Sequence, residues 1–415
     1  MIIIQKFGGT SVGSRQRIKF LKNIIKKYKN MNIHTVMILS AMSGETTKMI
    51  RIAKYFSFKN LKELDCLLCV GEQASISLFS ILLNSIKIKS KPLTSVQIGL
   101  ITNNDYSYAR ILNIKNYFLI KKILLKNKIP ILAGFQGITL SGNFTTLGRG
   151  GSDTTAIAIA AYLNAKECQI YTDVESIFFS DPRICKNFKI EFVPFENILE
   201  LSSSGSKVLY VRSIEIARKY NVNIRVLSSF LKNKGTLISN KNFFSNSMER
   251  SMISGITHSN NEAKITVKNI PNTAGVSSKI LGPIISSGIC VDMVIQNSII
   301  GEKYTNFTFL VENKFLKKSE FLIKKHVIPK LGGVLEHELN ITKISIVGIG
   351  LRTHNSVLDK MLYCMSKLKV NIILISTSET KISIVIKNKE TIKTIKELYL
   401  IFNKNFMFRR NGRVA

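Results

Sequence analysis

Residues 145–155 read Thr145-Thr-Leu-Gly-Arg-Gly-Gly-Ser-Asp-Thr-Thr155. They follow an apolar run, Ile131-Leu-Ala-Gly-Phe135, and lead into a proline-free segment of small and apolar residues that ends at Leu163. This order predicts a strand, a glycine-rich turn and the start of a helix. Glycines let the backbone come close to a ligand, and the N–H groups of a helix start favour an anion.

The polar side chains of this stretch point to the same kind of ligand. Arg149 carries a permanent positive charge on a planar fork of donors, which suits a carboxylate or a phosphate. Ser152 and Asp153 add a hydroxyl and a carboxylate at the expected helix start. The stretch therefore predicts a site for a phosphate or carboxylate ligand.

Length and composition indicate a globular protein of more than one domain. The chain has 415 residues, of which 45% are hydrophobic and 21% charged, so about two or three domains are expected. No uninterrupted apolar run reaches the ~18 residues that a transmembrane helix needs. The apolar start, Met1 to Ile4, is too short for a signal peptide. We therefore expect a cytoplasmic protein with no membrane partner.

The formal net charge of +34 does not by itself indicate nucleic-acid binding. Lysine is spread along the whole chain beside isoleucine and asparagine, a mixture typical of an AT-rich genome, whereas a nucleic-acid site needs a basic patch with interleaved aromatic residues. The five His have no metal-ligand spacing. Cys66 and Cys69 lack a second matching pair and lie in an apolar helical pattern, which favours buried structural thiols.

Two strands with polar loops begin the chain. Ile2 to Phe7 runs into Lys6-Phe-Gly-Gly-Thr-Ser-Val-Gly13, which is either a phosphate-binding loop or a plain strand-to-helix turn. Val36 to Leu39 runs into the hydroxyl-rich loop Ser40 to Thr47. A helix follows each strand, so a parallel sheet is expected, with ligands beyond the carboxyl ends of its strands.

The rest of residues 1–240 continues this α/β pattern. A long helix from Leu61 to Leu83 contains Glu72, which is either a solvated helix residue or a carboxylate aimed into a cleft. Residues 93–110 are expected to be a polar, loop-rich insertion. Further strands are predicted at 129–135, 168–174 and 223–227, with a helix at 208–220.

Residues 241–262 are polar and are predicted to be a linker, after which an internal repeat begins. Lys264-Ile-Thr-Val267 and Lys343-Ile-Ser-Ile346 start two copies that are offset by about 80 residues. Each copy has the order β-α-β-β-α-β of a ferredoxin-like domain. We place the first copy at 263–336 and the second at 337–415.

An ordered set of motifs identifies a family. Lys6-Phe-Gly-Gly-Thr-Ser-Val-Gly13, Leu147-Gly-Arg-Gly-Gly-Ser-Asp153, Tyr171-Thr-Asp173 and Asp181-Pro-Arg183 together resemble aspartate kinase. The resemblance extends from residue 1 to about 405, and it is closest to the monofunctional, lysine-pathway enzymes with two C-terminal ACT domains. It implies an amino-acid kinase fold, a mostly parallel open sheet sandwiched by helices, for residues 1–240, followed by the two ACT domains.

The resemblance also implies the reaction and its site. ATP and L-aspartate would give 4-phospho-L-aspartate and ADP with Mg²⁺, the first step of lysine, threonine and methionine biosynthesis. Catalysis would fall to Lys6 and to Asp153, which would orient Lys6, and no protein residue is expected to be a metal ligand. The aspartate pocket would be formed by Thr46, Glu72, Arg149, Gly150, Gly151 and Ser152. ATP would be held by Lys6, Phe7, Gly8, Gly9, Thr10, Ser11, Thr172, Asp173, Phe178, Asp181, Arg183, Lys207 and Val208.

Paired ACT domains imply feedback control by lysine, with or without threonine, and a homodimer or higher oligomer. Effectors would bind near Asp292, Gln296, Asn297, Asn371, Ile372, Ser378 and Glu379. The family's Pro-Asp-Thr-Pro-Gly turn is here Pro271-Asn-Thr-Ala-Gly275, so Asn272 lacks a charge near that site. We therefore expect inhibition to be weakened or lost. The alternatives are another kinase of the same fold, an amino-acid sensor without activity, and a nucleic-acid binder.

Overall fold

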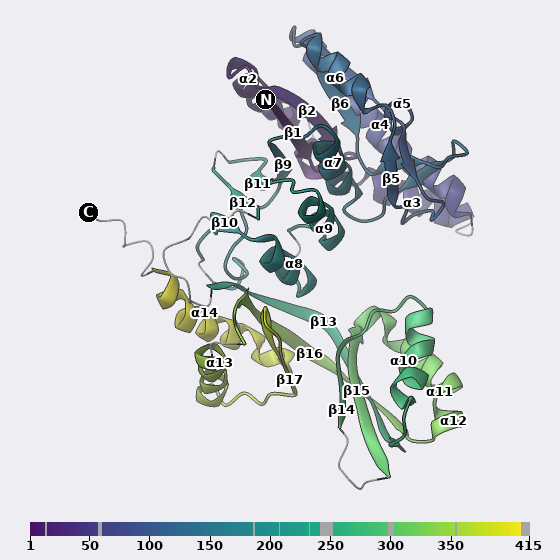
Figure 1. Ribbon diagram of the computed structural model, residues 1–415, viewed down its shortest axis with the longest axis vertical. Helices are drawn as coiled ribbons and strands as arrows, with labels where there is room; N and C mark the ends of the chain where they lie inside the picture. The colour runs from purple at the N-terminus through teal and green to yellow at the C-terminus, as the bar shows by residue number, and fades with distance from the viewer. Residues whose placement is uncertain are drawn as a thin grey trace. The chain divides into compact units, whose positions relative to one another are not determined.

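The computed structural model describes residues 1–12, 15–56, 60–185, 187–206, 208–231, 233–240, 252–297, 303–352 and 355–407 (Figure 1). The chain divides into two compact units. The N-terminal unit comprises residues 1–179 and 188–248, and the C-terminal unit comprises residues 180–187 and 249–415.

An eight-stranded sheet forms the centre of the N-terminal unit, with the strand order β10-β12-β11-β9-β1-β2-β6-β3. All its neighbouring strands are parallel except β11 and β12, which confirms the mostly parallel sheet. The strands are β1 (Ile2–Phe7), β2 (His34–Leu39), β3 (Ser90–Leu93), β6 (Ile129–Ala133), β9 (Glu167–Thr172), β10 (Phe192–Val193), β11 (Ile224–Ser228) and β12 (Thr236–Ile238).

Helices cover this sheet and connect its strands. Those described in the N-terminal unit are α1 (Gly9–Val12), α2 (Arg15–Asn30), α3 (Glu45–Phe56), α4 (Leu61–Ser85), α5 (Ser95–Ile98), α6 (Tyr117–Leu125), α7 (Gly151–Tyr162), α8 (Phe195–Ser203) and α9 (Val211–Lys219). Helix α7 packs on β1, β2 and β9, with α9 beside it (Figure 1). The predicted glycine-rich turn does lead into a helix, and that helix is α7.

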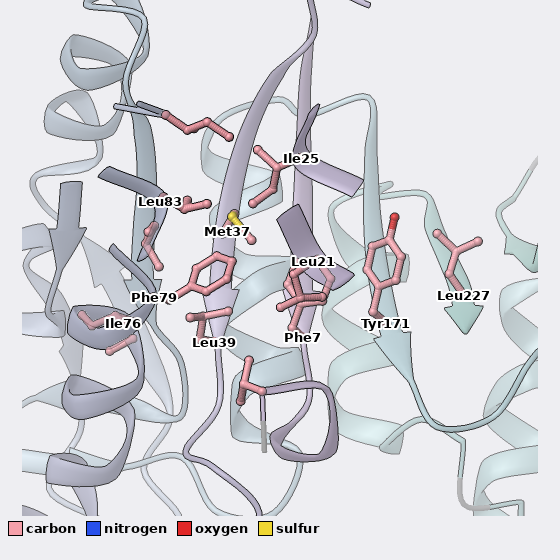
Figure 2. Packing of buried hydrophobic residues seen from close by; sticks show 14 residues of the cluster. Phe7, Leu21, Ile25, Met37, Leu39, Ile76, Phe79, Leu83, Tyr171 and Leu227 are labelled. Atoms are coloured by element: carbon pink, nitrogen blue, oxygen red, sulfur yellow. The ribbon is translucent and has the colours of Figure 1, made fainter. Parts of the chain in front are cut away.

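Side chains alternate between the two faces of the sheet along each strand, and both faces are buried. On one face Phe7 and Met37 pack with Leu21 of α2 and Phe79 of α4 (Figure 2). Phe7 also stacks on Tyr171, with 4.6 Å between the ring centroids. The neighbouring residue of β1, Lys6, therefore points to the opposite face.

Helix α4 is long and apolar enough, by length and composition, to cross a membrane. It instead packs against β3, β6 and β8 within the N-terminal unit. Its buried residues include Asp65 and Glu72 as well as apolar side chains such as Phe79. Cys69 is buried as expected, but the prediction was wrong for Cys66, which is exposed. The buried face of α4 includes Asp65, Leu68 and Cys69, and Cys66 lies just outside it.

A second, four-stranded sheet corrects the expected loop-rich insertion at 93–110. Its order is β5-β4-β7-β8, and within residues 93–110 the chain forms α5 and β4. The strands are too short to produce a periodic pattern: β4 (Leu100–Thr102), β5 (Ile111–Ile114), β7 (Gln136–Ile138) and β8 (Phe144–Thr146). Strand β8 leads directly into the glycine-rich turn before α7.

The C-terminal unit contains one six-stranded sheet with the order β14-β15-β13-β16-β18-β17. Its strands are β13 (Met252–Pro271), β14 (Asp292–Asn297), β15 (Tyr304–Glu312), β16 (Val334–Ile349), β17 (Leu374–Thr377) and β18 (Lys381–Lys387). Its helices are α10 (Val276–Ser286), α11 (Leu316–His326), α12 (Ile328–Leu331), α13 (Asn355–Lys367) and α14 (Thr391–Met407). The two repeats each supply two outer strands of this sheet, and the long strands β13 and β16 run through both halves.

The predicted linker is wrong over residues 252–262. These residues form the first half of β13, which pairs with the second half of β16 from Met252↔Ile349 to Ser259↔Lys343. The second repeat therefore receives its fourth strand from the chain segment that precedes the first repeat, and the predicted boundary at 337 falls inside β16. Polar residues around Asn260, where the register shifts, concealed the strand in the sequence.

Candidate active site

A cavity of about 210 Å³ lies in the N-terminal unit, at the carboxyl ends of the parallel strands. The chain leaves β1 at Gly8, β2 at Ser40 and β6 at Gly134, so three polar or glycine-containing loops meet there. Parallel strands place such loops at one edge of the sheet, which is where ligands bind in this class of fold. The cavity is lined by Lys6, Ser40, Thr46, Glu72, Phe135, Gly148, Arg149, Gly150, Gly151, Ser152, Asp153 and Tyr210.

An ion pair between Lys6 and Asp153 forms one wall of the cavity. The Lys6 Nζ atom lies 2.6 Å from Asp153 Oδ1, and the two side chains are only 12% and 8% exposed. Lys6 comes from β1, while Asp153 comes from the first turn of α7. The predicted contact between these two residues is therefore present, and the carboxylate fixes the lysine ammonium beside the N-terminus of a helix.

Close packing at Gly134 brings α7 against the end of β6. A Cβ atom at this position would lie 2.7 Å from Ser152 Cβ and 2.8 Å from Ser152 Oγ. These distances are shorter than real carbon contacts, so only glycine permits the approach. Gly134 thus sets the position of Ser152 in the cavity wall.

The open question about Glu72 is answered by its burial. This residue is 3% exposed and lines the cavity, although it stands in the middle of α4. Its Oε1 accepts a hydrogen bond of 3.1 Å from the backbone N–H of Ala41. Burial raises the pKa of the Glu72 carboxyl to about 7, while the Ala41 hydrogen bond acts in the opposite direction. Glu72 is a carboxylate of the cavity, not a solvated helix residue.

All six predicted aspartate-binding residues line this cavity together with Lys6 and Asp153. Arg149 is exposed and Thr46 is partly buried. Four lining residues were not predicted as site residues from the sequence, namely Ser40, Phe135, Gly148 and Tyr210. Ser40 and Phe135 follow β2 and β6 almost directly, so the strand-end rule could have found them. Tyr210 carries no signal of this kind.

The residues predicted to hold ATP are only partly brought together. Gly8 connects β1 to α1, which contains Gly9, Thr10 and Ser11, and Thr172 and Asp173 stand at the carboxyl end of β9. The Phe7 side chain is fully buried in the core, so only its backbone could meet a nucleotide. Phe178 and Val208 are partly buried, and Lys207 lies outside the described residues.

Asp181 and Arg183 belong to the C-terminal unit. The Arg183 Nη2 atom lies 2.7 Å from Asp181 Oδ2, and the hydrogen bonds from Arg183 lower the pKa of the Asp181 carboxyl. Their assignment to the nucleotide stays a prediction.

The predicted effector residues all lie in the C-terminal unit. Asp292, Gln296 and Asn297 belong to the edge strand β14, whereas Asn371, Ile372, Ser378 and Glu379 flank the opposite edge strand β17. Asp292 forms an ion pair with the buried Lys343, which lowers the pKa of the carboxyl against the effect of burial. Gln296 Oε1 accepts a hydrogen bond of 2.8 Å from Ser277 Oγ.

The comparisons with known proteins agree over nearly the whole chain. Residues 1–228 match the amino acid kinase family, and residues 344–402 match an ACT domain. The aspartokinase of Pseudomonas aeruginosa is 42% identical over 405 residues, covering 97% of each chain. The aspartate kinase of Pseudomonas fluorescens is 41% identical over 405 residues, again with 97% of each chain covered.

A solved structure shares the fold. Aspartokinase III of E. coli, in complex with aspartate and ADP, superposes with a TM-score of 0.76 at 21% identity, covering 96% of this chain and 99% of that one. The relatives match over nearly their full length, and the family models and the solved structure agree with them. The chain therefore belongs to the aspartate kinase family.

Proposed function

We propose that this protein transfers the γ-phosphoryl group of ATP to the side-chain carboxylate of L-aspartate, giving 4-phospho-L-aspartate and ADP. This would be the first step of lysine, threonine and methionine biosynthesis. The observation that carries the proposal is the charge pattern of a single cavity. Arg149 and Lys6 offer positive charge for the carboxylates and the moving phosphoryl group, and Glu72 offers negative charge for the ammonium.

The chemistry requires little more than these charges. The side-chain carboxylate of aspartate is ionised at neutral pH, so its oxygen attacks the γ-phosphorus without a general base. The bond from the γ-phosphorus to the β–γ bridging oxygen breaks, and ADP leaves with that electron pair. The obstacle is the repulsion between two anions and the charge on the transferred group. Lys6 would stabilise that charge, and Asp153, 2.6 Å from its ammonium, would hold it in position.

The other lining residues would recognise the amino-acid end of the acceptor. Arg149 would bind the α-carboxylate with two parallel hydrogen bonds. Glu72 would face the α-ammonium, and the binding of this cation would favour the ionised form of Glu72 over its protonated form. Thr46, Ser152 and the backbone of Gly150 and Gly151 complete the pocket.

The nucleotide and its metal would approach from the β1 and β9 strand ends. We propose that the backbone of Gly8, Gly9 and Thr10 faces the phosphates. Magnesium would arrive bound to phosphate oxygens of ATP, because Mg²⁺ keeps several waters and takes few protein ligands in such sites. Among the described residues, no group of three or more His, Cys, Asp or Glu side chains is placed to hold a metal. When bound, Mg²⁺ would neutralise charge on the phosphates.

Amino-acid control is proposed to be weak in this enzyme. A structure of E. coli aspartokinase III contains lysine and aspartate, and the ACT match supports regulation here. Two of the seven side chains predicted to meet an effector already have partners within the chain, Asp292 with Lys343 and Gln296 with Ser277. An effector would therefore have to break these contacts before it could bind. Calorimetric titration with lysine and with threonine tests this, and tight binding with full inhibition by either would contradict it.

A homodimer in the cytoplasm is the proposed working form. Strands β14 and β17 are edge strands of the six-stranded sheet, and unpaired edges invite pairing with a second copy. All six cysteines are free thiols, which suits a reducing compartment. Light scattering on the purified protein measures the oligomeric state, and a monomer at working concentration would contradict the dimer.

The decisive experiment is an ADP-release assay with MgATP and either aspartate or glutamate as the acceptor. We expect strong activity with aspartate and little with glutamate, because an extra methylene separates the reacting carboxylate from the ammonium and α-carboxylate that Glu72 and Arg149 would hold. Equal or greater activity with glutamate would favour a different acceptor specificity. No activity with either, under conditions in which ATP binds, would favour an amino-acid sensor.

A further inference from the structure

The loop that carries Arg149 has few means of holding its own shape. Gly148 and Gly150 flank Arg149, and their φ angles are +74° and +72°. Glycine tolerates this conformation, but it also loses the most conformational freedom when a loop becomes ordered. The Arg149 side chain is itself exposed. A guanidinium that must meet a small carboxylate at a fixed place therefore needs support from outside the loop.

Arg212, in the first turn of α9, supplies such support. Its Nη1 donates a hydrogen bond of 2.8 Å to the carbonyl of Leu147, and its Nη2 donates one of 2.6 Å to the carbonyl of Ala109. Leu147 directly precedes Gly148, so the first of these bonds fixes the entry to the Arg149 loop. The planar guanidinium holds both carbonyls in one geometry, which a single flexible ammonium does not achieve.

A carboxylate holds the same segment from another helix. Asp65 of α4 is fully buried. It accepts hydrogen bonds from the backbone N–H and the hydroxyl of Thr146, at 2.7 and 2.8 Å. It also accepts bonds from the backbone N–H and the hydroxyl of Ser107, at 2.7 and 3.1 Å. The backbone N–H of Ala109 donates to the Thr146 carbonyl over 2.9 Å. Two charged side chains thus fasten residues 107–109 to residues 146–147.

Aromatic rings flank the loop itself. A Cβ atom added at Gly148 would lie only 2.8 Å from Cδ1 of Tyr108. A Cβ atom added at Gly150 would lie only 2.3 Å from Cδ2 of Tyr210. Tyr108 and Tyr210 belong to the two segments that Arg212 connects, since Arg212 bonds to Ala109 and follows Tyr210 by two residues. Arg212 therefore helps to hold both rings, Tyr108 beside Gly148 and Tyr210 beside Gly150.

We propose that Arg212 is a positioning residue for the acceptor site, which holds Gly148-Arg149-Gly150 in the conformation that meets the α-carboxylate of aspartate. Arg212 does not line the cavity, so it acts through the loop and not on the substrate. This inference rests on the proposed aspartate site. It predicts that loss of the fork weakens the binding of aspartate more than it affects ATP or the phosphoryl transfer itself.

The test compares Arg212→Gln and Arg212→Lys with a matched control, Arg218→Gln. Arg218 lies on the same helix, is 52% exposed and pairs with Glu196. In Arg212→Gln we expect the KM for aspartate to rise by about tenfold or more, because binding must now order the loop. The KM for ATP and kcat should stay within about threefold of the wild type. Arg212→Lys should have a KM for aspartate between those of the wild type and Arg212→Gln, since an ammonium keeps the charge and can donate but lacks the rigid planar fork. Arg218→Gln should match the wild type.

An unchanged KM for aspartate in Arg212→Gln would overturn the proposal. A variant in which the KM for aspartate and the KM for ATP rise equally and kcat falls to the same extent would also overturn it, because that result would indicate a purely structural role. If Arg212→Gln does not fold, Arg212→Lys decides alone: a selective rise in the KM for aspartate supports the role, and wild-type kinetics overturn it. A wild-type enzyme without activity towards aspartate would instead contradict the proposed function.

Discussion

Replacement of Glu72 by Gln should stabilise the protein and weaken its binding of aspartate. The substitution keeps the shape of the side chain and lets the Ala41 N–H still donate to the Oε1 position. It removes the negative charge from a site that is only 3% exposed. The variant therefore separates the cost of burying this charge from its use in substrate binding.

The magnitude follows from the pKa of Glu72, which burial raises from 4.5 to about 7. A carboxyl with a raised pKa stabilises the folded state fully below about pH 4.5, and this contribution is lost as the pH rises through about 7. At pH 8 the ionised group costs roughly 3 kcal/mol, at ~1.36 kcal/mol per pKa unit. The Oε2 atom has no hydrogen-bond partner in the described structure, so an amide nitrogen placed there costs roughly 1–2 kcal/mol. Glu72→Gln should thus be more stable by about 1–2 kcal/mol at pH 8, and this difference should disappear or reverse near pH 5.

Denaturant unfolding at pH 5 and pH 8 measures this difference, with Glu63→Gln as the control because Glu63 is an exposed residue of the same helix. Steady-state kinetics give the second result. The wild-type KM for aspartate should rise as the pH falls below about 7, whereas Glu72→Gln should have a KM at least about tenfold higher at pH 8 that varies little with pH. A stability difference that is the same at both pH values would refute the titration of Glu72 near neutrality. A variant KM with the wild-type pH dependence would refute its role at the ammonium.

Three further predictions concern other contacts. Lys6→Ala should lower kcat by about 100-fold or more, and near-normal turnover would remove Lys6 from the mechanism. Gly134→Ala would force a methyl group to within 2.7 Å of Ser152 Cβ and should raise the KM for aspartate by about tenfold; unchanged kinetics would show that α7 can move without loss. Lys343→Met leaves Asp292 and Glu262 without their common cation and should lower the free energy of unfolding by about 2 kcal/mol, less than a fully buried pair because Asp292 is half exposed. Calorimetry of the variant checks this, and an unchanged unfolding temperature would contradict it.

The main sheet could be predicted because its strands are buried on both faces and read as continuous apolar runs. Strand β1 is one example, and its polar continuation at Gly8 and Gly9 lies at the strand ends where the cavity is found. The four-stranded sheet could not be predicted, because strands such as Leu100–Thr102 are three residues long and acquire their order only from pairing with distant strands. The first half of strand β13 was missed for a different reason, since Asn260 interrupts a strand whose two halves belong to different repeats.

In the site as well, the sequence predicted local features, whereas contacts between distant segments came from the tertiary structure. Lys6 and Asp153 are 147 positions apart, and only the family's motif set predicted that their side chains meet; the 2.6 Å contact between them follows from the packing of α7 on β1. Glu72 could not be assigned from α4 alone, because helix periodicity does not tell which buried residue faces a cavity. Tyr210 and Arg212 reach the Arg149 loop from α9, some 60 residues further along the chain, and no local pattern indicates that approach.

Very little of the high positive charge lies in the core of the described structure. The chain carries 60 lysine and arginine residues against 26 acidic ones. Among the described residues, Lys343 is the one buried basic residue, and it is neutralised by Asp292 and Glu262. Burial of an unpaired charge costs far more than exposure of another lysine, so substitutions to lysine could accumulate only on the surface. A lysine in place of Asp153 would be buried beside the positive charge of Lys6, and a lysine in place of Glu72 would be buried against the Ala41 N–H, which is also a donor. Both substitutions are therefore unfavourable, and the cavity keeps its carboxylates within a strongly basic chain.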